Sequence, residues 1–119
     1  MKIAITSQGQ TLDSAVDLRF GRAAGFVVVD TETQQTSFSD NAQNLTLAQG
    51  AGIQAAQNVA RTGAEAVITG HVGPKAYAAL HKGGIKIYLG ANGTVDEALK
   101  AFQAGTLEPA DSADKEGHW

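Results

Sequence analysis

Cysteine is absent from the 119-residue chain, and proline occurs only twice. The lack of cysteine excludes disulfides, thiolate metal ligands and a cysteine nucleophile together. No apolar run approaches the roughly 20 residues that a membrane-spanning helix needs. The opening stretch, MKIAITSQGQ, is too short and too polar for a secretory signal peptide. These absences predict a soluble, cytoplasmic protein.

A surplus of positive charge is also lacking, since the formal net charge is −3. The stretch 108–119 holds four acids and one lysine, so it alone accounts for −3 and residues 1–107 are neutral. We therefore predict one folded domain over 1–107, followed by an acidic, flexible tail over 108–119. The neutral body has no basic stripe for a nucleic-acid backbone, but it is compatible with an anionic ligand.

The hydrophobic pattern predicts an α/β protein. Strands are expected at 2–6, 25–31, 34–39, 66–70 and 85–90, and helices at 50–63, 74–84 and 94–105. The short turn at 31–34 makes the second and third strands an antiparallel hairpin. Right-handed crossovers place the first strand parallel to the last two. The result is a mixed five-stranded sheet flanked by helices, which matches the ribonuclease-H-like arrangement.

Two of the expected helices have local signals of their own. The spacing of Thr94 and Glu97 is that of a capping box, which predicts a helix start. In the first helix, Ile53, Ala56, Val59 and Ala60 fall on one face and are expected to point inward.

Glycine-bearing loops follow the three strands that are expected to be parallel, at 7–9, 70–73 and 90–93. Ligands of open α/β sheets gather at the carboxyl ends of such strands. The last two loops lead into helix N-termini, where free N–H groups favour negative charge, and Gly50 and Gly52 open the first helix in the same way. For any single loop, simple turn geometry explains the glycines equally well.

Two arginines, Arg19 and Arg22, flank Phe20 and Gly21 in the stretch DLRFGRAAG. They are candidates for holding an anion, while local ion pairs with Asp13 or Asp17 are the competing interpretation. His71, directly after a central strand, is either a hydrogen-bonding surface residue or a ligand. The three histidines lack the spacing of a metal site.

The sequence argues against catalysis. A two-metal nuclease needs clustered carboxylates, whereas the strands at 2–6, 66–70 and 85–90 contain none, and Asp30 and Asp40 are too dispersed. Neither a serine–histidine–aspartate order nor a nucleophile elbow occurs. We expect that the protein is not an enzyme.

Several stretches in order carry a family resemblance: FGRA at 20–23, GAGIQAAQNVARTGAEAVITGHVGPKAYAALHKGGIKIY at 50–88, and GTVDEALKAFQAGTL at 93–107. The chain resembles the dinitrogenase iron-molybdenum cofactor biosynthesis family, and most of all its small stand-alone members from sulfate-reducing bacteria. The resemblance implies a ribonuclease-H-like fold and binding of metal–sulfur cofactors or their precursors. It also implies, for the small members, a noncovalent molybdenum–copper sulfide cluster and association with a complex involved in cell division.

A cluster of this kind is a polyanion that brings its own sulfide ligands, so the protein has to supply charge, hydrogen-bond donors and apolar walls. We expect charge from Arg19 and Arg22, and a hydrogen bond or copper ligation from His71. The complete set of expected site residues is Arg19, Phe20, Gly21, Arg22, Leu47, Gly50, Gly52, His71, Val72, Gly73, Ala91, Asn92 and Gly93.

Three other interpretations stay open at the level of sequence. The cargo can be an iron–molybdenum cofactor precursor instead. The protein can be a cofactor-free adaptor that docks partners through its acidic tail. A magnesium-dependent hydrolase is the third and is not expected. The polar stretch 40–49 is expected to be a mobile loop near the site.

Overall fold

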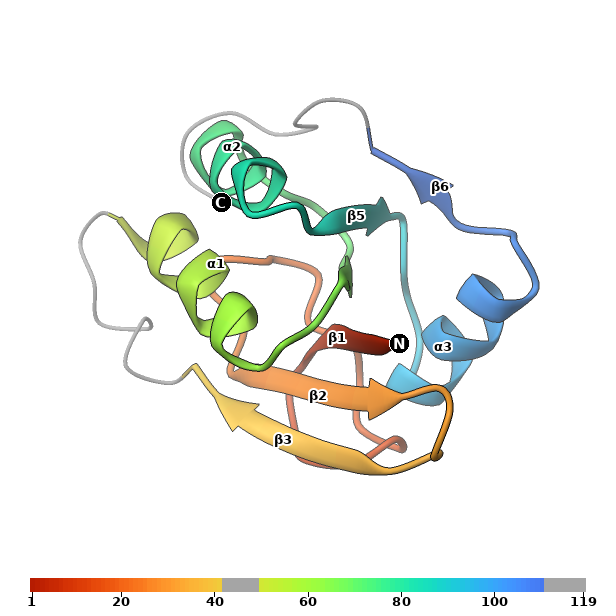
Figure 1. Ribbon diagram of the computed structural model, residues 1–119. Coiled ribbons are helices and arrows are strands. Elements are labelled where there is room, and N and C mark those ends of the chain that lie inside the picture. Colours follow the sequence, from red (N-terminus) through yellow and green to blue (C-terminus); the bar gives the residue numbers. More distant parts are fainter. Residues whose placement is uncertain (42–49, 111–119) are drawn as a thin grey trace.

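The computed structural model describes residues 1–41 and 50–110 (Figure 1). Within them it has six strands and three helices, and residues 42–49 and 111–119 lie outside the description. The strands are β1 (Lys2–Ser7), β2 (Gly25–Asp30), β3 (Thr36–Asp40), β4 (Ala66–Ile68), β5 (Lys86–Leu89) and β6 (Glu108–Pro109). The helices are α1 (Ala51–Arg61), α2 (Pro74–Lys82) and α3 (Val95–Gln103).

All six strands form one mixed sheet in the order β3-β2-β1-β4-β5-β6. β1, β4 and β5 run parallel, as predicted, and β2 and β3 form the predicted antiparallel hairpin. The predicted count of five strands is wrong. The sixth strand, β6, has only two residues and pairs antiparallel with β5 (Tyr88 opposite Pro109, Leu89 opposite Glu108). The ribonuclease-H-like assignment itself stays a prediction.

The sixth strand lies at the start of the stretch expected to be a solvated tail. Glu108 and Pro109 are both exposed and show no alternating pattern, so no local signal distinguishes them from a tail. Their pairing depends on the return of the chain from α3 to the edge of β5. Residues 111–119 of the expected tail lie outside the described residues.

The sheet separates two apolar clusters (Figure 1). On the face covered by α1 and α2, Phe20, Phe26, Val59, Val72 and Leu80 are among the buried members. On the face covered by α3, Ile3, Ile5, Ile68, Ala91 and Val95 are among them. Because alternate strand residues point to opposite faces, Ile3 and Ile5 lie in one cluster while Ala4 lies in the other.

Helix α1 differs from its predicted orientation. Ala55, Ala56 and Val59 are buried, but Ala60 is exposed and Ile53 is 40% exposed, so their predicted inward position is wrong. The buried face of α1 consists of Ala51, Ala55, Ala56, Asn58 and Val59, and Asn58 is buried through its hydrogen bond to Asn41. The helical period of the apolar residues does not predict that a polar residue lies on the buried face.

Of the stretch 40–49, expected to be a mobile loop, two residues are described. Asp40 ends β3, and Asn41 is fully buried. The rest of that expectation, including Leu47, falls on residues 42–49 and so lies outside the described residues.

Candidate functional site

The carboxyl ends of β1, β4 and β5 lie at one end of the sheet because the three strands are parallel and adjacent. The long segment between β1 and β2 passes over this end of the sheet. It forms isolated bridges from Ala15 to Thr94 and from Arg19 to His71. The predicted loops 7–9, 70–73 and 90–93 are therefore brought to one end of the molecule, as strand polarity requires.

Backbone hydrogen bonds join the arginine-bearing loop to the loop after β4. The His71 N–H donates to Leu18 O at 2.9 Å, and the Phe20 N–H donates to His71 O at 3.2 Å. Gly70 makes this approach possible, since a Cβ atom there would lie 2.8 Å from Leu18 O and 3.0 Å from Leu18 Cα. Arg19 is thus held beside His71 by main-chain contacts that do not involve its side chain.

A buried hydroxyl pair supports the same loop from below. Thr6 Oγ1 donates to Asp17 O at 2.7 Å and lies 2.9 Å from Thr69 Oγ1. Both threonines are fully buried at the carboxyl ends of β1 and β4. The backbone ahead of Arg19 is therefore fixed to the two central strands.

Asp17 does not neutralise Arg19 in the way that the competing interpretation requires. Its Oδ1 accepts a hydrogen bond from the backbone N–H of Arg19 at 3.2 Å, which forms a local turn. The Arg19 side chain is exposed and takes part in no ion pair with another described residue. Arg22 is half-buried.

The N-termini of α1 and α2 lie in contact next to this loop. A Cβ atom on Gly52, in the first turn of α1, would lie 3.1 Å from Ala76 Cβ in the first turn of α2. Gly50 and Gly73 are the N-caps, and neither has a side-chain cap. By contrast, α3 has the complete Thr94–Glu97 capping box, as predicted. Two N-termini with glycine at the N-cap therefore converge, while the third is capped by its own Thr94 and Glu97 side chains.

The remaining expected site residues fall into three groups. Phe20, Gly21, Val72 and Gly73 are buried, and the Phe20 ring lies 5.8 Å from that of Phe26 in the cluster beneath α1 and α2. Ala91 is buried in the cluster on the α3 face, and Asn92 and Gly93 are exposed beside it. The structure thus joins Arg19 and Phe20 to His71, brings Gly52 against the first turn of α2, and places Ala91 toward α3.

Two apolar residues at this end were missed by sequence reasoning. Leu18 is 46% exposed and contacts Gly70, while Ile53 is 40% exposed and follows Gly52. Large aliphatic side chains this exposed near polar loops are candidate walls for a ligand, whereas Val72 and Ala91 are already covered by the core. Leu18 was visible in the sequence as an apolar residue between Asp17 and Arg19.

Among the described residues, the carboxylates of Asp30 and Asp40 lie far apart. The strand register places Asp30 opposite Lys2 at one end of the sheet, and Asp40 opposite Gly25 at the other. In residues 1–41 and 50–110 there is no group of three or more histidine, aspartate or glutamate side chains arranged to hold a metal ion. No helix in these ranges has the length and apolarity to cross a membrane.

A family model described as "dinitrogenase iron-molybdenum cofactor" matches residues 1–105. The chain belongs to the dinitrogenase iron-molybdenum cofactor family. The expected family membership is thereby confirmed, and the match spans every described element except β6.

Two solved structures and a curated protein are similar to this chain over most of their length. The apo orange protein from Desulfovibrio gigas is 48% identical, with a TM-score of 0.93 and 96% of each chain covered. A protein from Thermotoga provisionally named NifB is 36% identical, with a TM-score of 0.85 and 98% of each covered. An uncharacterized protein of Methanocaldococcus jannaschii is 31% identical over 91% of this chain and 90% of its own. The family and the orange protein together indicate a metal-cluster-binding or carrier role.

Proposed function

We propose that this protein binds and carries an anionic metal–sulfide cluster noncovalently, and that it does not catalyse a reaction. The site lies between residues 17–22, the loop 71–73 and the N-termini of α1 and α2. The observation that supports it most is the exposed Arg19, whose neighbours Leu18 and Phe20 are bonded through the backbone to His71, near two helix N-termini with glycine at the N-cap. A molybdenum–copper sulfide cluster is the cargo we propose.

The donor set suits such a cargo. The chain has no cysteine, so it offers no thiolate to a soft metal, and a cluster with its own sulfides needs none. The outer sulfides of an anionic cluster accept hydrogen bonds, and guanidinium and helix N-terminal N–H groups are suitable donors. We assign charge to Arg19 and Arg22, and a hydrogen bond or copper ligation to His71.

Apolar walls complete the proposed site. We assign this role to Leu18 and Ile53, because both are exposed, with Val72 and Phe20 forming the buried floor. Asn92 and Gly93 would border the site on the α3 side, where the Glu97 carboxylate already occupies the helix N-terminus. Leu47 belongs to the proposal as well, although it lies outside the described residues.

The test is reconstitution of the purified protein with tetrathiomolybdate and a copper salt, followed by desalting, visible absorption and elemental analysis. The wild type should retain a chromophore with stoichiometric molybdenum and copper. Arg19→Gln and Arg22→Gln should each weaken retention by roughly tenfold or more, since a charged hydrogen bond contributes about 1.5–3 kcal/mol.

Arg61→Gln is the matched control, because Arg61 lies at the opposite end of α1 and bonds to Asn58. Equal retention by all three variants would exclude a role for the two loop arginines. A colourless, metal-free wild type would exclude the molybdenum–copper cargo. An iron–molybdenum precursor would then be tested in the same assay. A cofactor-free adaptor predicts instead a partner, such as a cell-division-associated complex, whose binding ignores metals and is lost on removal of residues after Leu107.

A further inference from the structure

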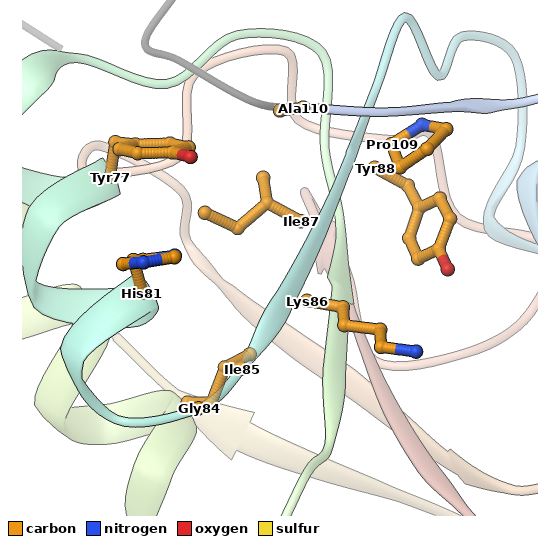
Figure 2. A pocket seen from close by; sticks show the side chains of 9 residues that line it. All are labelled: Tyr77, His81, Gly84, Ile85, Lys86, Ile87, Tyr88, Pro109 and Ala110. Carbon is orange, nitrogen blue, oxygen red and sulfur yellow. The ribbon is translucent and has the colours of Figure 1, made fainter.

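A groove of about 650 Å³ lies along the edge of the sheet beside α2 (Figure 2). Its lining comes from α2, the turn after it, β5, and the chain at and just after β6. The lining residues are Tyr77, His81, Gly84, Ile85, Lys86, Ile87, Tyr88, Pro109 and Ala110. We call it the β5 groove. Most of it lies toward the C-terminal end of α2, away from the Gly73 cap that belongs to the proposed cluster site.

One wall of the β5 groove is an aromatic pair. The rings of Tyr77 and His81, one helical turn apart, are stacked with centroids 5.8 Å apart and planes at 9°. Figure 2 shows the two rings one above the other, with Ile87 of β5 facing them. Flat ring edges opposite an aliphatic side chain are a suitable surface for another aromatic ring.

The chain itself leads directly into the groove. The Ala110 N–H donates to Ile87 O at 2.8 Å, so the last described residue is bonded to the strand that forms the groove floor. Residues 111–119 continue from there with the sequence DSADKEGHW, which contains the only tryptophan of the chain, Trp119. Nine extended residues reach up to about 30 Å, comparable with the 35 Å longest dimension of the molecule.

Charge is complementary between this segment and the groove. Residues 111–119 hold three acids and one lysine, a formal net charge of −2. None of the nine lining residues is acidic. Lys86 of β5 lines the groove, and Lys82 follows His81 in the last turn of α2. Both lysines are exposed. Opposite charges of this kind orient a bound segment more than they add to its affinity.

We propose that residues 111–119 fold back into the β5 groove of the same chain, with the Trp119 indole against the Tyr77–His81 pair. The acids then lie near Lys82 and Lys86. The docked segment covers the aromatic pair and the edge of the sheet at β6. This surface is separate from the proposed cluster site, so either proposal can fail without the other.

The single tryptophan makes the test direct, because selective indole excitation reports on Trp119 alone. Emission and acrylamide quenching are compared between the whole protein and a free peptide of residues 111–119. We expect the protein to emit at shorter wavelength and to be protected from acrylamide. His81→Ala, Tyr77→Ala and the pair Lys82→Glu/Lys86→Glu should each lose this protection and move the emission toward that of the peptide.

Matched controls lie on the same helix outside the groove: Ala78→Ser for the rings and Lys75→Glu for the charges, both at exposed positions. These should behave as wild type. Because Tyr77 packs against the core and its loss can unfold the helix, circular dichroism accompanies every variant, and the exposed His81 provides the test that does not depend on core packing.

Three results would overturn the proposal. One is an emission and quenching profile equal to that of the free peptide. Another is protection that survives all groove variants, which would place Trp119 elsewhere. The third is protection that grows with protein concentration, which would mean that a second copy supplies the segment.

Discussion

Among single residues, the buried amides Asn41 and Asn58 connect the segment behind the arginine-bearing loop to α1. Asn58 Nδ2 donates to Asn41 Oδ1 at 2.6 Å, and Asn41 Nδ2 donates to Ala23 O at 2.9 Å. Buried polar groups of this kind stabilise a fold only when they are paired, because each has given up its water. The pair therefore fixes the position of residues 23–24, directly after Arg22.

Asn58→Ala removes the donor from the buried Asn41 oxygen. We expect it to lower the free energy of unfolding by about 1–3 kcal/mol, the cost of removing a hydrogen bond between two buried polar groups. Chemical denaturation measures the loss. Gln57→Ala, at the exposed neighbouring position of α1, is the control and should change the stability by less than about 0.5 kcal/mol. Equal effects of the two variants would contradict the assigned role of Asn58.

Asp30 provides a pH-dependent prediction at the same scale. Hydrogen bonds from the backbone N–H groups of Glu32, at 2.9 Å, and Thr33 lower the pKa of its carboxyl, and the nearby N-terminal ammonium lowers it further. A lowered folded-state pKa means that the ionised group stabilises the fold above the usual carboxyl range, and that this contribution disappears as the pH falls through the lowered value.

Asp30→Asn should therefore be less stable than wild type near neutral pH, and the difference should shrink as the solution becomes acid. Urea titrations at a series of pH values measure it. Asp13→Asn is the control, because Asp13 is exposed and accepts no hydrogen bond among the described residues. A difference between Asp30→Asn and wild type that does not vary with pH would exclude this origin.

At the scale of elements, the close approach of the loop after β4 to the arginine-bearing loop depends on Gly70. Gly70→Ala places a methyl group 2.8 Å from Leu18 O, and since the neighbour is backbone, the loop has to move. We expect cluster retention in the reconstitution assay to fall although Arg19, Arg22 and His71 are all present. The rest of the fold should persist.

Gly83→Ala is a matched glycine control at the end of α2. Its φ of −80° suits alanine, and the nearest atom to the added Cβ would be 3.5 Å away. Circular dichroism and thermal unfolding check that both variants fold. Full retention of the cluster by Gly70→Ala would show that the position of this loop does not matter for binding.

At the scale of the whole molecule, the chain after α3 returns to the sheet and adds β6 beside β5. This return gives a prediction about truncation. Removing residues 108–119 deletes β6 and the bond from Ala110 N to Ile87 O, leaving β5 as an unprotected edge. Removing only 111–119 keeps these bonds. We expect the longer deletion to cost about 1–2 kcal/mol more, from the lost backbone hydrogen bonds. Equal unfolding midpoints would contradict a structural role for β6.

Much of the fold follows from local patterns. The alternation in residues 2–6 and the short turn after Asp30 predict β1 and the hairpin, and the Thr94–Glu97 spacing predicts the start of α3. The gathering of the loops after β1, β4 and β5 follows from strand polarity once the crossovers are known. Family membership was likewise predictable from motifs in order along the chain.

The features that the sequence did not predict share one physical cause, which is that they depend on contacts with other elements of the fold. Ile53 has the right helical spacing to be buried, yet α1 buries the face that carries Asn58, which bonds to Asn41, and Ile53 is left exposed. Asp17 is close enough in sequence to pair with either arginine, but a turn directs its carboxylate to the Arg19 backbone instead. Ala91 follows a central strand like His71, but it is buried on the opposite face.

The sequence by itself determined the α/β class, the neutral charge of residues 1–107, the absence of thiolate chemistry and the end of the sheet at which the loops after the parallel strands gather, because composition, period and strand polarity are local properties. Only the tertiary structure decided which loops touch, that the N-termini of α1 and α2 converge beside Arg19, and that β6 closes the sheet beside the β5 groove. These features arise from contacts between residues far apart in the chain, and no periodicity along the sequence records them.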